Sequence, residues 1–130
     1  MRALRTIASL FRWVLSLLLL TPAAIAADLE WPDRDKLDAK GVEILFARYA
    51  QASKKPLGTD QDVESIKKVV VVHMKRASAR VNEIRWLSPT LIMAETSWHE
   101  APKAGGTYFY IVEKNKDTWV VKTYYLIEVN

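Results

Sequence analysis

Residues 105–129 read GGTYFYIVEKNKDTWVVKTYYLIEV, and this stretch decides the fold. Two runs rich in Val, Ile, Thr, Tyr and Trp, residues 107–114 and 118–129, flank the polar segment 115–117. Residues of these types favour strands, and a short polar connection between two such runs is typical of a β-hairpin. The sequence therefore predicts an antiparallel hairpin here.

Two further strands are predicted before this hairpin, at residues 80–87 and 91–99. Ser88-Pro89 separates these two strands, and residues 101–106 connect the second to the hairpin. The result is a four-stranded antiparallel meander, in which each strand pairs with the next.

Two helices are predicted before the strands. The first begins near Asp33 or Asp35 and ends near Ala52, and the second, capped by Thr59 with Asp62 three residues on, runs from 60 to about 77. The run Val69–Val72 is β-prone, so helix and strand remain alternatives there, although the cap and the apolar stripe favour helix. The sequence predicts an α+β fold, with two N-terminal helices covering one face of a curved sheet.

The last predicted strand is apolar on both faces. One side carries Trp119, Val121, Thr123, Tyr125, Ile127 and Val129, and the other carries Val120, Tyr124 and Leu126. A strand with one face exposed to solvent alternates more regularly between apolar and polar residues. The sheet is therefore strongly curved, or its second face contacts a partner or a second copy of the chain.

Residues 1–26 have the pattern of a secretory signal peptide. Three arginines precede the apolar run Trp13–Leu20, and Ala24-Ile25-Ala26 forms a small-x-small cleavage site. An uncleaved membrane anchor is the alternative, but the apolar run is shorter than the roughly 20 residues that span a bilayer. We expect cleavage near Ala26, no stable membrane anchor, a periplasmic or secreted location, and a single α+β domain over residues 27–130.

Charge and cysteine content narrow the classes of function. The 130 residues carry 19 basic and 15 acidic groups, a formal net charge of +4. Removal of residues 1–26 takes away three arginines and leaves a nearly neutral domain, which argues against a nucleic-acid partner. The chain has no cysteine, so no disulfide stabilises it.

Few residues in this sequence are candidates for catalysis or metal binding. Glu95, Ser97 and His99 share one face of a predicted strand, but neighbours on that face stand about 7 Å apart and no nucleophile-elbow motif surrounds the serine. A solvated polar face is the simpler interpretation. His73 lies beside the apolar stripe of the second helix, where a hydrogen-bonded histidine is more common than a ligand. We expect no metal and no cofactor.

The aromatic residues fall on the predicted strands. They form the core, line a pocket in a curved sheet, or form a binding face, because Trp and Tyr dominate interface hot spots. The ligand- or partner-binding candidates are Trp86, Trp98, His99, Tyr108, Tyr110 and Tyr124. Basic residues around the second helix, Lys67, Lys68, Lys75, Arg76 and Arg80, form a solvated face or contact an anionic partner.

Residues 105–114 and 116–121, with their aromatic strand, charged turn and W-x-V strand, resemble the closing hairpin of nuclear transport factor 2-like domains. The resemblance implies a cone-like fold in which helices wrap a bent sheet, within a family of small enzymes, binding modules and toxin-neutralising proteins. The usual third helix is not evident, so a cystatin-like variant is equally compatible.

We therefore expect an exported binding protein that uses a sheet face or concave pocket for a protein partner or small apolar ligand, with an inhibitor or immunity protein as one form. One alternative is a small periplasmic hydrolase or isomerase using His99 with Glu95, or His73. Another is a structural subunit that forms a homodimer through its sheet.

Overall fold

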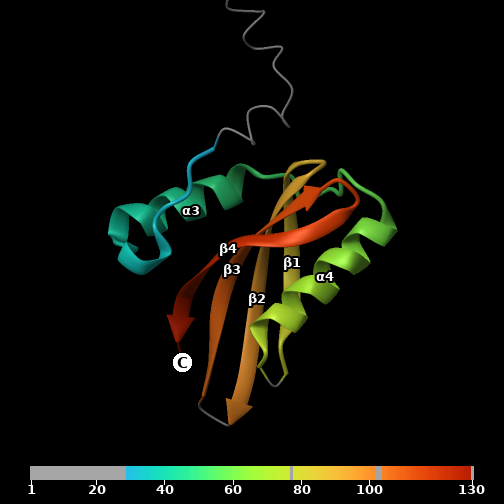
Figure 1. Cartoon of the computed structure of the whole chain (residues 1–130). Helices are drawn as coiled ribbons and strands as arrows, with labels where there is room; N and C mark the ends of the chain where they lie inside the picture. Colours follow the sequence, from blue (N-terminus) through green and yellow to red (C-terminus); the bar gives the residue numbers. More distant parts are fainter. Residues whose placement is uncertain (1–28, 77, 102–103, 130) are drawn as a thin grey trace, which may run out of the picture.

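The computed structural model describes residues 29–76, 78–101 and 104–129. They form two α-helices, a short 3-10 helix and one antiparallel sheet with the strand order β1-β2-β3-β4 (Figure 1). The predicted α+β class, two helices followed by a four-stranded meander, is confirmed. The predicted signal peptide lies outside the described residues. The elements are η1 (Arg34–Lys36), α3 (Ala39–Gln51), α4 (Asp60–Met74), β1 (Arg80–Ser88), β2 (Leu91–Ala101), β3 (Ala104–Asn115) and β4 (Thr118–Val129).

Helix α4 begins at the predicted cap. The Asp62 backbone N–H donates to Thr59 Oγ1 at 3.0 Å, and the Asp62 carboxylate accepts from the Thr59 N–H at 2.9 Å. This capping box starts a helix that continues through the run 69–72, so the helix alternative is correct for that run. The helix ends at Met74, before the predicted end, because Lys75 adopts a left-handed backbone with φ of 52°.

Helix α3 begins later than predicted. Asp33 caps η1 instead, accepting a hydrogen bond from the Asp35 N–H, and the chain then becomes extended at Leu37. Asp38 caps α3 by accepting from the Gly41 N–H at 2.8 Å. The predicted end of this helix is correct within one residue.

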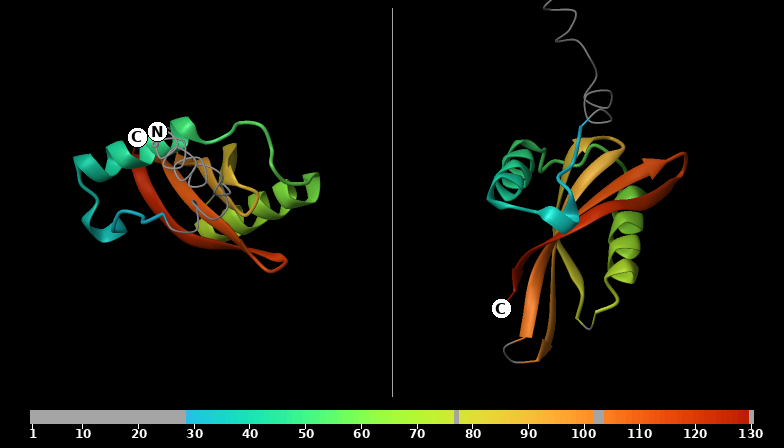
Figure 2. Two further views of the ribbon diagram at one scale, coloured as in Figure 1. Left: turned by 90° about the horizontal axis from the view of Figure 1, so that it is seen from above. Right: turned by 60° about the vertical axis from the view of Figure 1, so that its left-hand side comes forward.

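The two helices lie on opposite faces of the sheet, as the two views of Figure 2 show, and not on one face as expected. Successive strand residues alternate between faces, and they divide between two core clusters. One cluster packs Ile66, Val70 and Met74 of α4 against residues that include Ile92 and Val112, and the other packs Leu45 and Tyr49 of α3 against residues that include Met93 and Ile111. Both faces of the sheet are apolar because each has its own helix to cover it.

A bulge in β4 explains why that strand is apolar on both sides. Ile111 pairs with Thr123 and Val112 pairs with Val121, so Lys122 is an extra residue in the ladder. The bulge reverses the alternation: Trp119 lies in the α4 cluster and Tyr125 in the α3 cluster. The prediction that these two rings share a face is therefore wrong, because an unbroken period of two does not survive the bulge.

The predicted connection at residues 101–106 is also shorter in the structure. Strand β2 continues to Ala101 and β3 begins at Ala104, so Gly106 lies within a strand and pairs with Trp98. A Cβ atom on Gly106 would lie 2.9 Å from the Trp98 indole nitrogen. Glycine is needed here because the Glu128 carbonyl oxygen, also 2.9 Å from such a Cβ, and the indole ring leave no room for a side chain, and not because the chain turns.

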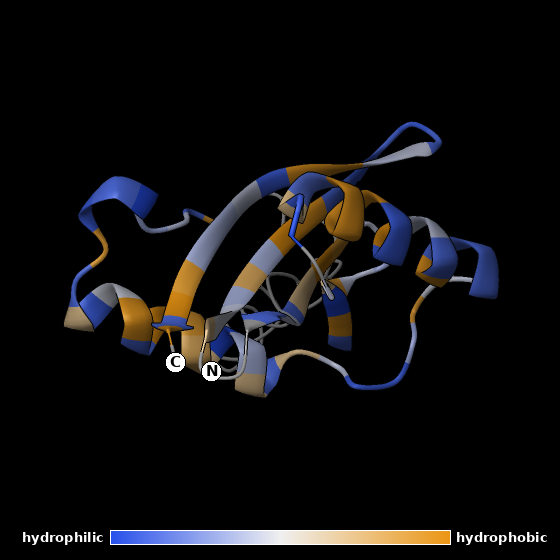
Figure 3. Cartoon of the chain, turned by 90° about the horizontal axis from the view of Figure 1, so that it is seen from below, coloured by the Kyte–Doolittle hydropathy of each residue, from blue (hydrophilic) through white to orange (hydrophobic). Residues whose placement is uncertain are grey.

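The distribution of apolar and polar residues agrees with this arrangement of helices and sheet. In Figure 3 apolar and polar bands alternate around α4, and the turn between β3 and β4 is hydrophilic. Within the described ranges, no helix has both the length and the apolar character needed to cross a membrane.

Candidate functional site

The predicted site residues divide between the two faces of the sheet. Trp86, Trp98, Tyr108, Tyr110 and Tyr124 lie in or against the α4 cluster. His99 follows Trp98 in β2 and pairs with Gly105, so its side chain lies on the α3 side. The six candidates therefore do not form one site.

Two of these candidates belong to the core. Trp86 and Tyr110 are each 2% exposed. Trp86 packs edge-to-face against Trp119, with ring centroids 6.0 Å apart. Burial leaves these two rings little surface for a ligand, so Trp98, Tyr108 and Tyr124, all half-buried, are the aromatic candidates that reach the surface.

The tyrosines form a continuous ring cluster with His73, on the last turn of α4. Tyr110 and Tyr124 stack with centroids 5.2 Å apart, and Tyr108 packs edge-to-face on both. His73 packs against Tyr110 and Tyr124, and its Nδ1 lies 3.0 Å from the Tyr110 hydroxyl. Helix α4 ends at this cluster, so the strands beyond it are not covered by the helix.

Electrostatics keep His73 neutral. Burial, and then the charges of Lys75 and Arg34, lower the pKa of His73 below its ordinary value of 6.5. Burial raises the pKa of Tyr110, so its hydroxyl keeps its proton. At neutral pH an uncharged imidazole and a protonated hydroxyl therefore share this hydrogen bond.

Two guanidinium groups lie over rings at the border of the cluster. Arg34 lies 4.3 Å from the centroid of Tyr124, and Arg76 lies 4.2 Å from that of Trp98. Arg76 also pairs with Glu100 at 3.1 Å, and this carboxylate, with the Tyr108 hydroxyl, raises the pKa of Arg76. A guanidinium group stacked on a ring restricts the orientation of that ring and fixes the position of its own charge.

Exposed apolar side chains extend the ring cluster along β4. Leu126 pairs with Tyr108, and Val129 pairs with Gly106, which itself pairs with Trp98, so all of them face the α4 side. Leu126 is 45% exposed and Val129 is 64% exposed. We call the set Trp98, Tyr108, Tyr124, Leu126 and Val129 the aromatic surface.

The segment before α3 passes the open edge of β4 beside this surface. Tyr125, on the α3 side, donates from its hydroxyl to the Pro32 carbonyl at 2.6 Å, whereas Arg34 lies over Tyr124 on the α4 side. These two contacts, one on each side of β4, cover the middle of its outer edge. Without them this edge would be open to pairing with another strand.

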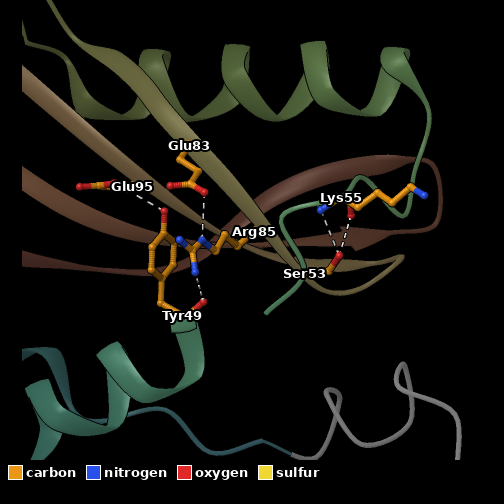
Figure 4. A network of polar contacts seen from close by, with 6 residues as sticks. All are labelled: Tyr49, Ser53, Lys55, Glu83, Arg85 and Glu95. Carbon is orange, nitrogen blue, oxygen red and sulfur yellow. Dashed lines mark hydrogen bonds and ion pairs between the residues drawn. The ribbon is translucent and has the colours of Figure 1, made fainter. Parts of the chain in front are cut away.

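The α3 side of the sheet is polar where the strands leave the helix. The Tyr49 hydroxyl lies 3.5 Å from Glu95, and Arg85 pairs with Glu83 at 3.0 Å while donating to the Tyr49 carbonyl (Figure 4). Arg85 lowers the pKa of Glu83, and burial raises the pKa of Tyr49. These contacts tie the end of α3 to β1 and β2.

Beyond this network lies a cavity of about 460 Å³, lined by Ser78, Arg80, Ser97, Trp98, His99, Gly106 and Thr107. It brings together Ser97 and His99, as the sequence predicts. The Ser97 Oγ, however, accepts from Arg80 Nε at 3.2 Å and donates to Asn82 Oδ1 at 3.3 Å. In the described part of the chain no hydrogen bond joins Ser97 to His99, and Glu95 bonds Tyr49 instead.

Sequence reasoning missed several contributors. Two irregularities in β4, at Lys122 and at Ile127, concealed that Leu126 and Val129 share the face of Trp98. Arg34 reaches Tyr124 from a segment far away in the sequence, so no local pattern indicated that contact. The clustered basic residues around α4 did contain a signal, because Arg76 and Arg80 each border a candidate site.

Among the described residues, no group of three or more His, Asp or Glu side chains could hold a metal ion. No protein-family model, curated protein or solved structure matches this chain.

Proposed function

We propose that this chain is an exported binding protein that presents the aromatic surface to a protein partner. The supporting observation is that exposed Leu126 and Val129 continue a half-buried Trp and Tyr cluster on a part of the sheet that α4 leaves uncovered. Contiguous exposed apolar area on a soluble domain is typical of interaction sites.

The composition of this surface suits a protein more than a small molecule. Protein interfaces are enriched in Tyr, Trp and Arg, and their hot spots are rigid rings surrounded by polar groups. Here the rings are held by stacking, and Arg34 and Arg76 border them. An inhibitor or immunity protein, which neutralises its partner by covering it, is one form of this proposal, and a small apolar ligand is the other occupant to test.

The test is affinity purification from a cell-envelope extract, with the partner quantified by mass spectrometry. Leu126→Asp places a charge on the aromatic surface, and Leu57→Asp places one in a loop elsewhere. The control is matched because these leucines are 45% and 43% exposed. We expect a partner that is retained by the wild type and by Leu57→Asp and is depleted at least about tenfold with Leu126→Asp. Recovery that is equal for both variants, or no recovery at all, contradicts the proposal.

The other expectations stay predictions. The hydrolase or isomerase alternative gains no support from Ser97, whose hydroxyl bonds Arg80 and Asn82. A homodimer through the sheet is tested by sedimentation at high micromolar concentration. We retain the nuclear transport factor 2-like family and the periplasmic location as proposals, supported by the order of elements and by the sequence of residues 1–26.

A further inference from the structure

The cavity on the α3 side shares Trp98 with the aromatic surface, but its polar lining lies on the opposite face of the sheet. Its floor is a row of paired residues that crosses three strands, Arg80 of β1, Ser97 of β2 and Thr107 of β3. His99 lies one row further on, opposite Gly105, which has no side chain to fill the space. A volume of about 460 Å³ is within the range of small-molecule sites.

The groups that line this cavity are mainly hydrogen-bond donors. Ser78, Ser97 and Thr107 supply hydroxyls, His99 supplies an imidazole, and Arg80 supplies a guanidinium. The bond from Arg80 Nε to Ser97 Oγ fixes the guanidinium while leaving its two terminal nitrogens for other acceptors. A guanidinium held in this way is suited to a carboxylate, which it binds through two parallel hydrogen bonds.

The nearby acids do not neutralise Arg80. None of the ion pairs in the described ranges includes it. Glu83 pairs with Arg85, and Glu100 pairs with Arg76. Glu128 ends the same row of the sheet, but three strand spacings, about 14 Å, separate its backbone from that of Arg80.

We propose that this cavity binds a small monocarboxylate ligand, with Arg80 as the anchor and the Ser97, Thr107 and His99 side chains as further polar contacts. Arg80 is the one permanent cation among the described residues that line the cavity, and a single positive charge matches a monoanion better than a phosphate dianion. The surrounding hydroxyls suit the polar remainder of such a molecule.

The test uses NMR titration of the protein purified after expression of the full chain. The probes are N-acetylalanine, its uncharged amide, and inorganic phosphate. We expect N-acetylalanine to give saturable shifts of the Ser97 and Thr107 amides, and its amide to bind at least about tenfold more weakly because the charge-assisted bonds are lost. Saturation by phosphate without saturation by N-acetylalanine overturns the carboxylate assignment.

Two variants complete the test. Arg80→Gln should weaken N-acetylalanine binding at least about tenfold, and because Arg80 is exposed the variant should keep the dispersed spectrum of a folded domain. Glu128→Gln, on the same row but outside the cavity lining, should change binding less than about threefold. No saturable shift, equal binding of the amide, or full binding by Arg80→Gln would each refute the site.

Discussion

At the scale of single residues, His73 shows how packing determines protonation. The ring contacts two tyrosines at the end of α4, and its Nδ1 is hydrogen-bonded to the Tyr110 hydroxyl. Burial disfavours the imidazolium, and the positive charges of Lys75 and Arg34 oppose it further, so the pKa is lowered. Protonation of His73 therefore opposes the packing that orders the aromatic surface.

This gives a pH dependence of stability. Because the folded state binds the proton more weakly than the unfolded chain, the stability that depends on neutral His73 is fully present above the unfolded pKa, near 6.5, and is lost as the pH falls below it. We expect the free energy of unfolding, from urea titrations between pH 5.5 and 8, to decrease towards acid. His73→Gln should remove most of this decrease, and His99→Gln should retain it. An unchanged slope in His73→Gln would show that another group is responsible.

At the scale of elements, Asp62 joins α4 to the β3–β4 hairpin. Beyond its place in the capping box, its Oδ1 accepts from Lys114 Nζ and from Trp119 Nε1, each at 3.0 Å. The Thr59 backbone N–H, Trp119 and Lys114 hold the pKa of Asp62 far below its ordinary value. One carboxylate thus fixes the start of a helix to a hairpin more than fifty residues later in the chain.

Removing the Asp62 side chain should therefore lower the free energy of unfolding by more than removing a helix cap does. We expect Asp62→Ala to lower the free energy of unfolding by about 3 kcal/mol, from about 1 for the cap and about 1 for each of the two further bonds. Asp60→Ala, in the same helical turn, should cost about 0.5 kcal/mol through the helix dipole alone. Urea unfolding followed by circular dichroism measures both. Equal costs would mean that the contacts with Lys114 and Trp119 contribute little.

At the scale of the whole molecule, the two helices cover opposite faces of the sheet but leave the same strand ends open on both sides. The aromatic surface lies on one side of β2, β3 and β4, and the polar cavity lies on the other side of the sheet. The side chains of Trp98 and His99, adjacent in the chain, lie on opposite faces because strand residues alternate, although both residues line the cavity. A thin sheet with open ends can therefore present two chemically distinct surfaces.

The sequence predicted what local patterns encode. The Thr59 cap, the helical stripe of α4 and the order of the strands are short-range signals, and they were correct. It could not assign α3 to a face, because both helices are amphipathic and both sheet faces are apolar. It also could not locate the bulge at Lys122, which depends on pairing with β3 and determines the face on which Leu126 lies.

Site-specific photo-crosslinking in intact cells tests the proposed binding surface directly. A benzoylphenylalanine probe would replace Leu126 in the aromatic surface or, as the matched control, the similarly exposed Leu57. We predict a discrete adduct of higher mass from the probe at position 126 and none from position 57. An adduct from position 57 alone, or none from either position, would contradict the assignment of the aromatic surface as the partner-binding face.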